Sequence, residues 1–247
     1  MTLTRLFIPG DLQQGQNMQL DPEQTHYLGR VLRLRRGDVL RVFNGNCGEF
    51  AAVVASLGKN RAELEVGARL VTSTESALRV HLVQGISRGE RMDFIVQKAT
   101  ELGVKRITPV LTAFGVVKLA GERADKRLSH WQKIAIGAAE QCGRVRPPLI
   151  DVAVPLKSWL GSKPRDVNVD LILRPGAATA MTSVAAPCTK VCLLVGPEGG
   201  FSEAEYDDAA VAGFLPVSLG PRVLRTETAA MTAIAVAAAL WGDLGPH

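Results

Sequence analysis

Two glycine-rich segments near the C-terminus constrain the fold of this chain most. They read VGPEGGFS at residues 195–202 and LGPRVLRTETA at residues 219–229, and each follows a short apolar run typical of a buried strand. Each also leads into a predicted helix. In an α/β sheet, such loops lie together at the carboxyl ends of the strands, where backbone N–H groups and helix N-termini converge on ligands. We therefore predict a binding site built mainly from these two loops.

From residue 78 onward, the pattern alternates between strands and helices. Predicted strands cover 78–83, 107–111, 169–173, 191–195 and 214–217. Predicted helices cover 91–102 and 128–141, where apolar residues recur at helical spacing and a glycine follows. This order predicts an α/β fold with a mostly parallel sheet covered by helices.

The two glycine-rich segments also carry helix-start signals. Ser202 and Glu205 form a capping-box pattern, and Gly213 is placed to end that helix. Thr226 is predicted to cap the closing helix. Gly199 and Gly200 are expected to allow close approach of the backbone to a ligand, although a tight turn alone explains the same residues. A P-loop requires a Lys-Ser or Lys-Thr pair after the glycines, and its absence here disfavours nucleoside triphosphate binding.

The N-terminal part of the chain has a different pattern. Short extended runs cover 39–43, 49–57 and 61–66, and Asn44-Gly45 after the first of them is a type I′ hairpin signal. The single predicted helix covers 22–32, with Asp21 as its cap. A polar stretch at 72–76 is typical of a linker. We predict a small β-barrel at residues 1–72 and a larger domain at 73–247.

Positive charge is concentrated in two parts of the sequence. The chain carries 29 Lys and Arg against 24 Asp and Glu, a net charge of +5. One group is Arg30, Arg33, Arg35, Arg36 and Arg41; the other is Lys118, Arg123, Lys126, Arg127, Lys133, Arg144 and Arg146. Such patches suit a polyanion such as RNA. A solvated charged face explains either patch, taken alone, equally well.

Several classes of protein are disfavoured by the sequence. The longest apolar stretch, 229–241, is too short to span a membrane, and the first residues lack the pattern of a secretion signal, so we expect a cytoplasmic protein. The four cysteines, at 47, 142, 188 and 192, predict reduced thiols rather than a disulfide framework. Because the histidines are scattered, we expect no metal site.

Several motifs together resemble one known family. QKATELGV (97–104), EQCGR (140–144) and both glycine-rich segments are similar to the ribosomal RNA small subunit methyltransferase E family of the SPOUT superfamily. RLF (5–7) and HYLGRVLR (26–33) resemble its N-terminal domain, so the match runs in order through nearly the whole chain. The resemblance implies a PUA-like RNA-binding β-barrel followed by a SPOUT methyltransferase domain with a trefoil knot.

The resemblance also implies an activity. Members of this family act as homodimers and methylate N3 of one uridine in 16S ribosomal RNA of the 30S subunit, with S-adenosyl-L-methionine as the methyl donor. By resemblance, the cofactor pocket contains Leu173, Gly196, Gly199, Gly200, Leu219, Gly220, Leu224 and Thr226. Residues expected to contact RNA are Arg5, Arg30, Arg33, Arg35, Arg36, Lys118 and Arg123.

Three residues are the predicted catalytic set. Methylation of N3 requires removal of its proton, and a fixed cation stabilises the charge that then spreads onto O2 and O4. Arg225 is the leading candidate for this cation, and Arg144 is expected to reach the site from the facing subunit. Glu198 is a candidate proton acceptor, as is Glu227, although each could instead orient an arginine.

One segment departs from the family pattern. Residues 112–115 read TAFG, where the family usually has Thr or Ser, then Glu-Arg and a small residue. Ala113 and Phe114 thus replace an acidic and a basic side chain, and we expect a rebuilt contact with substrate or with a second subunit. Two alternatives stay open: a SPOUT methyltransferase with another RNA target, and a non-catalytic RNA-binding assembly protein of the same fold.

Overall fold

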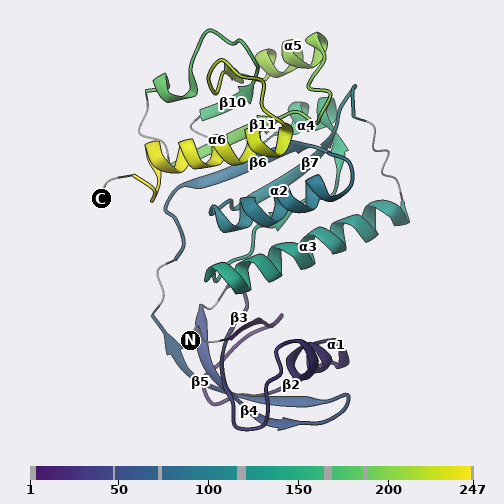
Figure 1. Cartoon of the computed structure of the whole chain (residues 1–247), viewed down its shortest axis with the longest axis vertical. Coiled ribbons are helices and arrows are strands. Elements are labelled where there is room, and N and C mark those ends of the chain that lie inside the picture. Colours follow the sequence, from purple (N-terminus) through teal and green to yellow (C-terminus); the bar gives the residue numbers. More distant parts are fainter. Residues whose placement is uncertain are drawn as a thin grey trace. The chain divides into compact units, whose positions relative to one another are not determined.

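The computed structural model describes residues 4–46, 48–71, 74–115, 121–163, 169–185 and 189–245. The chain divides into two compact units (Figure 1). The first comprises Met1–Glu75 together with Ala139–Pro147, and the second comprises Ser76–Ala138 with Pro148–His247. The segment 139–147 includes the end of a continuous helix, so the sequence pattern carried no sign that it packs with the N-terminal unit.

Among the described helices, none has the length and apolar character needed to cross a membrane.

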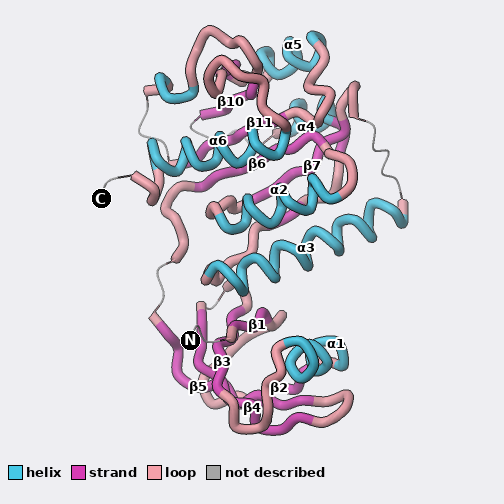
Figure 2. The backbone as a smooth tube through the Cα atoms, in the orientation of Figure 1, coloured by secondary structure: helices cyan, strands magenta, loops and turns pink. Residues whose placement is uncertain are grey.

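The N-terminal unit is a curled five-stranded sheet (Figure 2). Its strands are β1 (Arg5–Phe7), β2 (Asn17–Leu20), β3 (Val39–Phe43), β4 (Glu49–Leu57) and β5 (Ala62–Leu70), in the spatial order β1-β3-β4-β5-β2. The pairing of β1 with β3 is parallel and the others are antiparallel. Two register shifts between β4 and β5 are irregularities of the kind that bend a sheet. The sheet encloses an apolar core with Leu28, Leu40 and Leu64 at its centre.

Two local features of this unit differ from the prediction. Helix α1 (Pro22–His26) begins with the expected Asp21 cap, but after five residues it continues as the π-helical segment η1 (Tyr27–Val31). The connection from β3 to β4 spans residues 44–48, which is longer than the two-residue turn that Asn44-Gly45 indicated. Both glycines of this loop, at 45 and 48, have positive φ, so the loop reverses the chain without a type I′ pair.

The C-terminal unit is built on a seven-stranded sheet. Its strands are β6 (Arg79–Gly85), β7 (Arg106–Leu111), β8 (Leu149–Ile150), β9 (Val154–Pro155), β10 (Val169–Leu173), β11 (Lys190–Val195) and β12 (Leu215–Val217). The order is β12-β10-β11-β6-β7-β8, with β9 also beside β7, and every recorded pairing is parallel. The predicted parallel sheet is confirmed.

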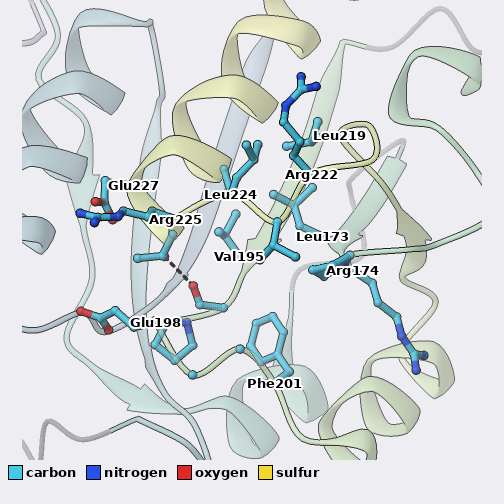
Figure 3. A pocket seen from close by; sticks show the side chains of 18 of the residues that line it. Leu173, Arg174, Val195, Glu198, Phe201, Leu219, Arg222, Leu224, Arg225 and Glu227 are labelled. Carbon is cyan, nitrogen blue, oxygen red and sulfur yellow. Dashed lines mark hydrogen bonds between the residues drawn. The ribbon is translucent and has the colours of Figure 1, made fainter.

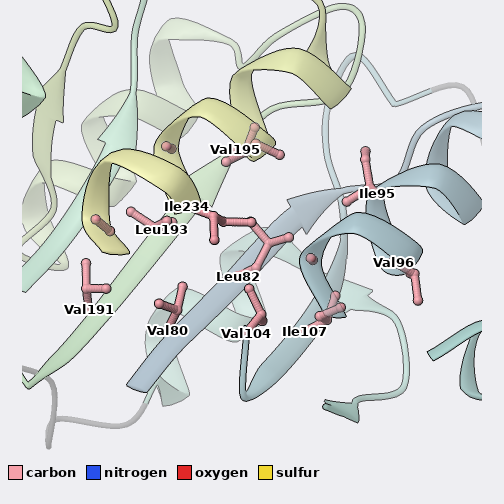
Figure 4. Packing of buried hydrophobic residues seen from close by; sticks show 14 of the residues in the cluster. Val80, Leu82, Ile95, Val96, Val104, Ile107, Val191, Leu193, Val195 and Ile234 are labelled. Carbon is pink, nitrogen blue, oxygen red and sulfur yellow. The ribbon is translucent and has the colours of Figure 1, made fainter. Parts of the chain in front are cut away.

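Helices cover both faces of this sheet (Figure 1). One face packs against α2 (Glu90–Glu101), α3 (Glu122–Cys142) and α6 (Thr226–Trp241); the other packs against α4 (Leu156–Ser162) and α5 (Glu203–Val211). A single-turn 3₁₀ helix, η2 (Met181–Ser183), lies in the connection from β10 to β11. Because side chains of a strand alternate, Leu82 packs toward Ile234 in one core (Figure 4), while the next residue, Val83, belongs to the other.

Candidate functional site

A cavity of about 660 Å³ lies in the C-terminal unit at the carboxyl ends of β10, β11 and β12 (Figure 3). Because β10 pairs with both β11 and β12, the loops that follow these strands meet here. The cavity collects every residue predicted for the cofactor pocket: Leu173, Gly196, Gly199, Gly200, Leu219, Gly220, Leu224 and Thr226. Glu198 and Arg225 line it too. The two glycine-rich segments thus line one cavity, and binding of a ligand there stays a prediction.

The first glycine loop folds tightly on itself. The N–H of Gly200 donates to the carbonyl of Pro197 at 2.9 Å, and Gly200 has a φ of +70°. A side chain on Gly196 would place its Cβ 3.1 Å from Gly200 Cα, whereas a Cβ on Gly200 would meet open space. Glycine is therefore required at 196 by the turn and at 200 by the backbone conformation. The turn leaves main chain uncovered on the cavity side of Gly200.

Glycine at 199 was expected to let a ligand approach the backbone, but the structure gives a different reason. A Cβ there would lie 2.9 Å from Phe114 Cβ and 3.2 Å from Phe114 O, so its missing side chain makes room for the loop 112–115, not for a ligand. Sequence reasoning also missed Gly85, at the end of β6. A Cβ on Gly85 would lie 2.5 Å from the backbone nitrogen of Pro197. Glycine at this position therefore lets the first glycine loop pack against the end of β6.

The two loops are tied together by Thr226. Its hydroxyl donates to the carbonyl of Gly196 at 2.6 Å and accepts from Gln84 Nε2 at 3.0 Å. The prediction that Thr226 caps α6 is therefore wrong: Thr226 is the first helical residue, and Arg225 occupies the N-cap without a side-chain cap bond. Gln84, which is fully buried in β6, also donates to Gly196 O at 3.3 Å. The available signal for Gln84 was an amide directly after the apolar pair Leu82 and Val83.

Charged side chains also line the cavity. Arg225 and Arg222 are exposed, and neither makes a side-chain hydrogen bond or ion pair within the described residues. Glu227 also lines the cavity, and its Oε2 is buried with no hydrogen-bond partner in the described part of the chain. The cavity thus presents cations and one carboxylate oxygen that protein partners leave unsatisfied. Such groups are available to a ligand.

Glu198, by contrast, is firmly held. Its Oε1 accepts from Arg91 Nη1 at 2.7 Å and from the N–H of Arg88 at 3.0 Å. Burial raises the pKa of the Glu198 carboxyl, but the Glu198 backbone N–H, Arg91 and the Arg88 N–H outweigh burial, so that the net pKa lies below its usual value. Glu198 is therefore an ionised carboxylate that links the glycine loop to the start of α2. Sequence reasoning did not single out Arg91, which also lines the cavity.

Comparisons with known proteins agree with this geometry. An RNA methyltransferase domain model matches residues 74–238, and an RNA methyltransferase PUA domain model matches residues 20–67. The chain is 32% identical over 241 residues to Ribosomal RNA small subunit methyltransferase E of Buchnera aphidicola from Acyrthosiphon pisum, covering 98% of this chain and 95% of that one. The corresponding Bacillus subtilis protein is 28% identical, with 90% of each chain covered. The chain belongs to the ribosomal RNA small subunit methyltransferase E family.

Two solved structures are similar over almost the whole chain. The family member from Neisseria gonorrhoeae, solved bound to S-adenosyl methionine, has a TM-score of 0.91 and 39% identity, covering 98% of this chain and 99% of that one. A Legionella pneumophila protein, solved with bound SAM, has a TM-score of 0.94 and 41% identity, covering 98% and 100%. These likenesses confirm the predicted SPOUT fold class with its PUA-like N-terminal domain.

The residues predicted to contact RNA differ in their exposure to solvent. Arg30, Arg33, Arg35, Arg36 and Arg123 are exposed. Arg5 is buried: its guanidinium pairs with Glu49 at 2.6 Å and donates to the carbonyls of Ala139 and Arg144. This burial gives Arg5 a structural role in the N-terminal unit and does not support a contact with RNA. Lys118 lies outside the described residues.

Arg144 is also buried in the N-terminal unit. Only 3% of Arg144 is exposed, and its Nη2 donates to Glu75 Oε2 at 3.1 Å. The same carboxylate accepts from the N–H groups of Val145 and Arg146. Within its own unit, Arg144 therefore anchors the segment that follows α3. Its predicted role at a facing subunit's site stays a prediction.

The cysteines take no visible part in the site. Cys142 and Cys192 are free thiols, while Cys47 and Cys188 lie outside the described residues. Burial, followed by the charge of Asp170, raises the pKa of the Cys192 thiol far above its usual value. Cys192 is therefore a neutral core side chain. Across the described ranges, no three His, Cys, Asp or Glu side chains gather as a metal site would require.

Proposed function

We propose that this protein is an S-adenosylmethionine-dependent methyltransferase that methylates N3 of a uridine in 16S ribosomal RNA. The observation that carries the proposal is the cavity at the carboxyl ends of β10, β11 and β12, which gathers the predicted cofactor residues with Arg225. Membership of the family and likeness to structures solved with this cofactor support the same reading.

The residues of the cavity fit the cofactor. Leu173, Val195, Leu219 and Leu224 supply an apolar surface of the kind that an adenine ring requires (Figure 3). Uncovered main chain at Gly200 and Gly220, both with positive φ, supplies backbone hydrogen-bonding groups beside it. We infer that these residues hold the cofactor. When bound, S-adenosylmethionine supplies a methyl group activated by a positively charged sulfur.

The side chains around the cavity suit deprotonation of a uridine. Removal of the N3 proton leaves negative charge on O2 and O4. The guanidinium of Arg225, which lines the cavity and has no side-chain partner in the described part of the chain, can stabilise that charge. Glu198 is ionised but committed to Arg91, so we assign it an orienting role. Glu227, whose Oε2 lacks a partner among the described residues, is the better candidate for the proton acceptor.

The partners of the reaction belong to the same proposal. We infer that the substrate is 16S ribosomal RNA within the 30S subunit and that the enzyme acts as a homodimer in the cytoplasm. The matched PUA domain and the exposed arginines Arg30, Arg33, Arg35 and Arg36 support an RNA substrate.

The decisive experiment is transfer of a radiolabelled methyl group to 30S subunits from cells that lack this protein, followed by identification of the modified nucleoside. N3-methyluridine is expected. A different methylated nucleoside, or transfer only to transfer RNA tested in parallel, would indicate another RNA target. No transfer, with no S-adenosylmethionine binding by calorimetry, would point to the non-catalytic alternative.

The role of Arg225 is tested by Arg225→Ala. Removing one group that stabilises developing negative charge lowers kcat by about 10²–10³-fold. The affinity for S-adenosylmethionine should change little, because the apolar and backbone parts of the cavity stay in place. Lys157→Ala, an exposed cation on α4 of the same unit, is the control for loss of charge. Unchanged methylation by Arg225→Ala removes Arg225 from the mechanism.

A further inference from the structure

Phe114 is an exposed aromatic residue beside the cavity. Its exposed fraction is 54%, and its ring makes no aromatic or cation–π contact within the described residues. Its Cβ and carbonyl oxygen lie against Gly199, which lines the cavity. An exposed ring contributes little to folding, and its face is open to contact with a ligand.

The backbone that carries this ring is fixed. The N–H of Ala113 donates to Glu205 Oε1 at 2.8 Å, and the N–H of Gly115 donates to the carbonyl of Thr112 at 3.0 Å. The other oxygen of Glu205 closes the capping box with Ser202 at the start of α5. One carboxylate therefore holds both the helix that follows the glycine loop and the turn that carries Phe114. These bonds place Phe114 beside Gly199, a residue that lines the cavity.

The charges around this cavity suit RNA. Arg222 and Arg225 line the same cavity and have no side-chain partner within the described residues. Unpaired cations of this kind attract the phosphates of RNA. Sequence-specific recognition of RNA commonly targets unpaired bases, which stack on aromatic side chains.

We propose that Phe114 stacks on an unpaired base of the RNA substrate at the mouth of the cavity. This inference rests on the proposed function, because it places the ring against the RNA that enters the methyl-transfer site. It also accounts for Gly199: the glycine admits the backbone of Phe114 beside the cavity. Phe114 would then contribute to the choice and the positioning of the substrate.

The test compares three substitutions in the full-length protein: Phe114→Leu, Phe114→Ala and Phe114→Trp. Leucine keeps an apolar side chain of similar size but has no aromatic face, so it separates stacking from packing. Loss of one base–aromatic stack is expected to lower kcat/KM for 30S subunits about 5- to 150-fold in the Leu and Ala variants. Phe114→Trp should restore it. Thermal unfolding and S-adenosylmethionine affinity should match the unsubstituted protein in the Leu variant.

Two results would overturn the inference. The first is a Phe114→Leu enzyme whose KM and kcat for 30S subunits equal those of the unsubstituted protein. The second is a shift of Phe114→Ala from dimer to monomer in light scattering, which would make the ring part of a subunit interface.

A failure of the proposed function gives a distinct signature. If the unsubstituted protein transfers no methyl group, filter binding of 16S ribosomal RNA still decides the role of Phe114. Weaker binding by the Leu variant with rescue by Trp supports stacking, and equal binding by all three variants refutes it.

Discussion

At the scale of single residues, the glycines at the site fall into two groups, according to why the chain needs glycine there. Gly85 and Gly199 leave room for protein atoms, namely Pro197 and Phe114, whereas Gly200 and Gly220 need glycine for their positive φ and face open space. The sequence showed that glycines cluster here but not which atoms press on each one, since those contacts join segments far apart in the chain. This is why Gly85 was missed and Gly199 was assigned to the ligand.

Substitution of Gly85 tests whether glycine is needed there to avoid a clash with Pro197. In Gly85→Ala, the new Cβ would lie 2.5 Å from the backbone nitrogen of Pro197, and a backbone atom cannot move aside cheaply. Overpacking of this kind costs about 1–3 kcal/mol, so thermal unfolding should occur several degrees lower. S-adenosylmethionine affinity should fall as well, because the displaced segment is the glycine loop. Gly137→Ala, in α3 with open space around the new Cβ, is the control; equal melting temperatures for both variants would contradict the assignment.

Thr226 offers a second test at this scale. Thr226→Val keeps the shape but removes the donor to Gly196 O and leaves Gln84 Nε2 one acceptor fewer in a buried place. Loss of a buried hydrogen-bond partner costs about 1–3 kcal/mol. Calorimetry should show weaker S-adenosylmethionine binding together with lower stability. Thr228→Val, an exposed position two residues along the same helix, should change neither quantity; identical affinity in Thr226→Val would show that the tie between the loops is dispensable.

At the scale of elements, the two helix starts at the site show where a local pattern is sufficient and where it is not. The Ser202–Glu205 capping box and the Gly213 stop are local, and both are present around α5. Thr226 has the same local preference for a cap, but its hydroxyl is used by Gly196, thirty positions away in sequence. A competing long-range acceptor leaves no mark on the sequence near a helix start.

The double use of Glu205 gives a prediction for α5. Ser202→Ala removes the cap acceptor and the hydroxyl donor to Glu205, but keeps the bond from the Ser202 N–H, and should cost about 0.5–2 kcal/mol. Glu205→Ala removes the reciprocal bonds to Ser202 and also frees the N–H of Ala113, so it should cost more and should impair methylation in addition. Chemical denaturation and RNA methylation assays of the two variants test this order. Equal losses of activity would mean that the 112–115 turn does not need its anchor.

The end of α3 supplies a pH test in the N-terminal unit. Burial raises the pKa of Glu140 above its usual 4.5, although the Phe7 N–H, the Tyr27 hydroxyl and Arg5 act in the opposite direction. A carboxyl whose folded-state pKa is raised stabilises most below its unfolded pKa and loses that contribution as pH rises through the folded value. Glu140→Gln should therefore gain stability relative to the unsubstituted protein as the pH rises above the usual 4.5, measured by urea unfolding. A difference that does not change with pH would refute the shift.

At the scale of the whole molecule, composition and motif order were enough for the fold class. The βαβ alternation predicted the parallel sheet, and the family resemblance supplied the PUA-like unit. The inclusion of Ala139–Pro147 in the N-terminal unit was out of reach, because it depends on carbonyls of this segment accepting from Arg5 and on Glu75 holding Arg144. The trefoil knot implied by the resemblance stays a prediction.

The exposed arginines after α1 lead to a prediction for RNA binding as a whole. Arg30, Arg33, Arg35 and Arg36 are all exposed, and Arg33 has a φ of +56°, a left-handed conformation that is costly for a residue with a side chain. A variant with Arg30→Ala, Arg33→Gly, Arg35→Ala and Arg36→Ala removes four charges, and glycine at 33 avoids added backbone strain. If these arginines contact phosphates, RNA affinity falls and its dependence on salt becomes shallower.

The expected change in the salt dependence of RNA affinity can be calculated from the number of contacts. Each phosphate contact contributes about 0.7–0.9 to the slope of log affinity against log salt, so the slope should decrease by about 3 for four contacts. Filter binding of 16S ribosomal RNA over a range of salt concentrations measures it. Arg61→Ala, an exposed arginine of the same unit, is the control for net charge alone. A uniform loss of affinity with an unchanged slope would mean that the four side chains act by shaping the unit and not by binding phosphates, because only released counterions alter the slope.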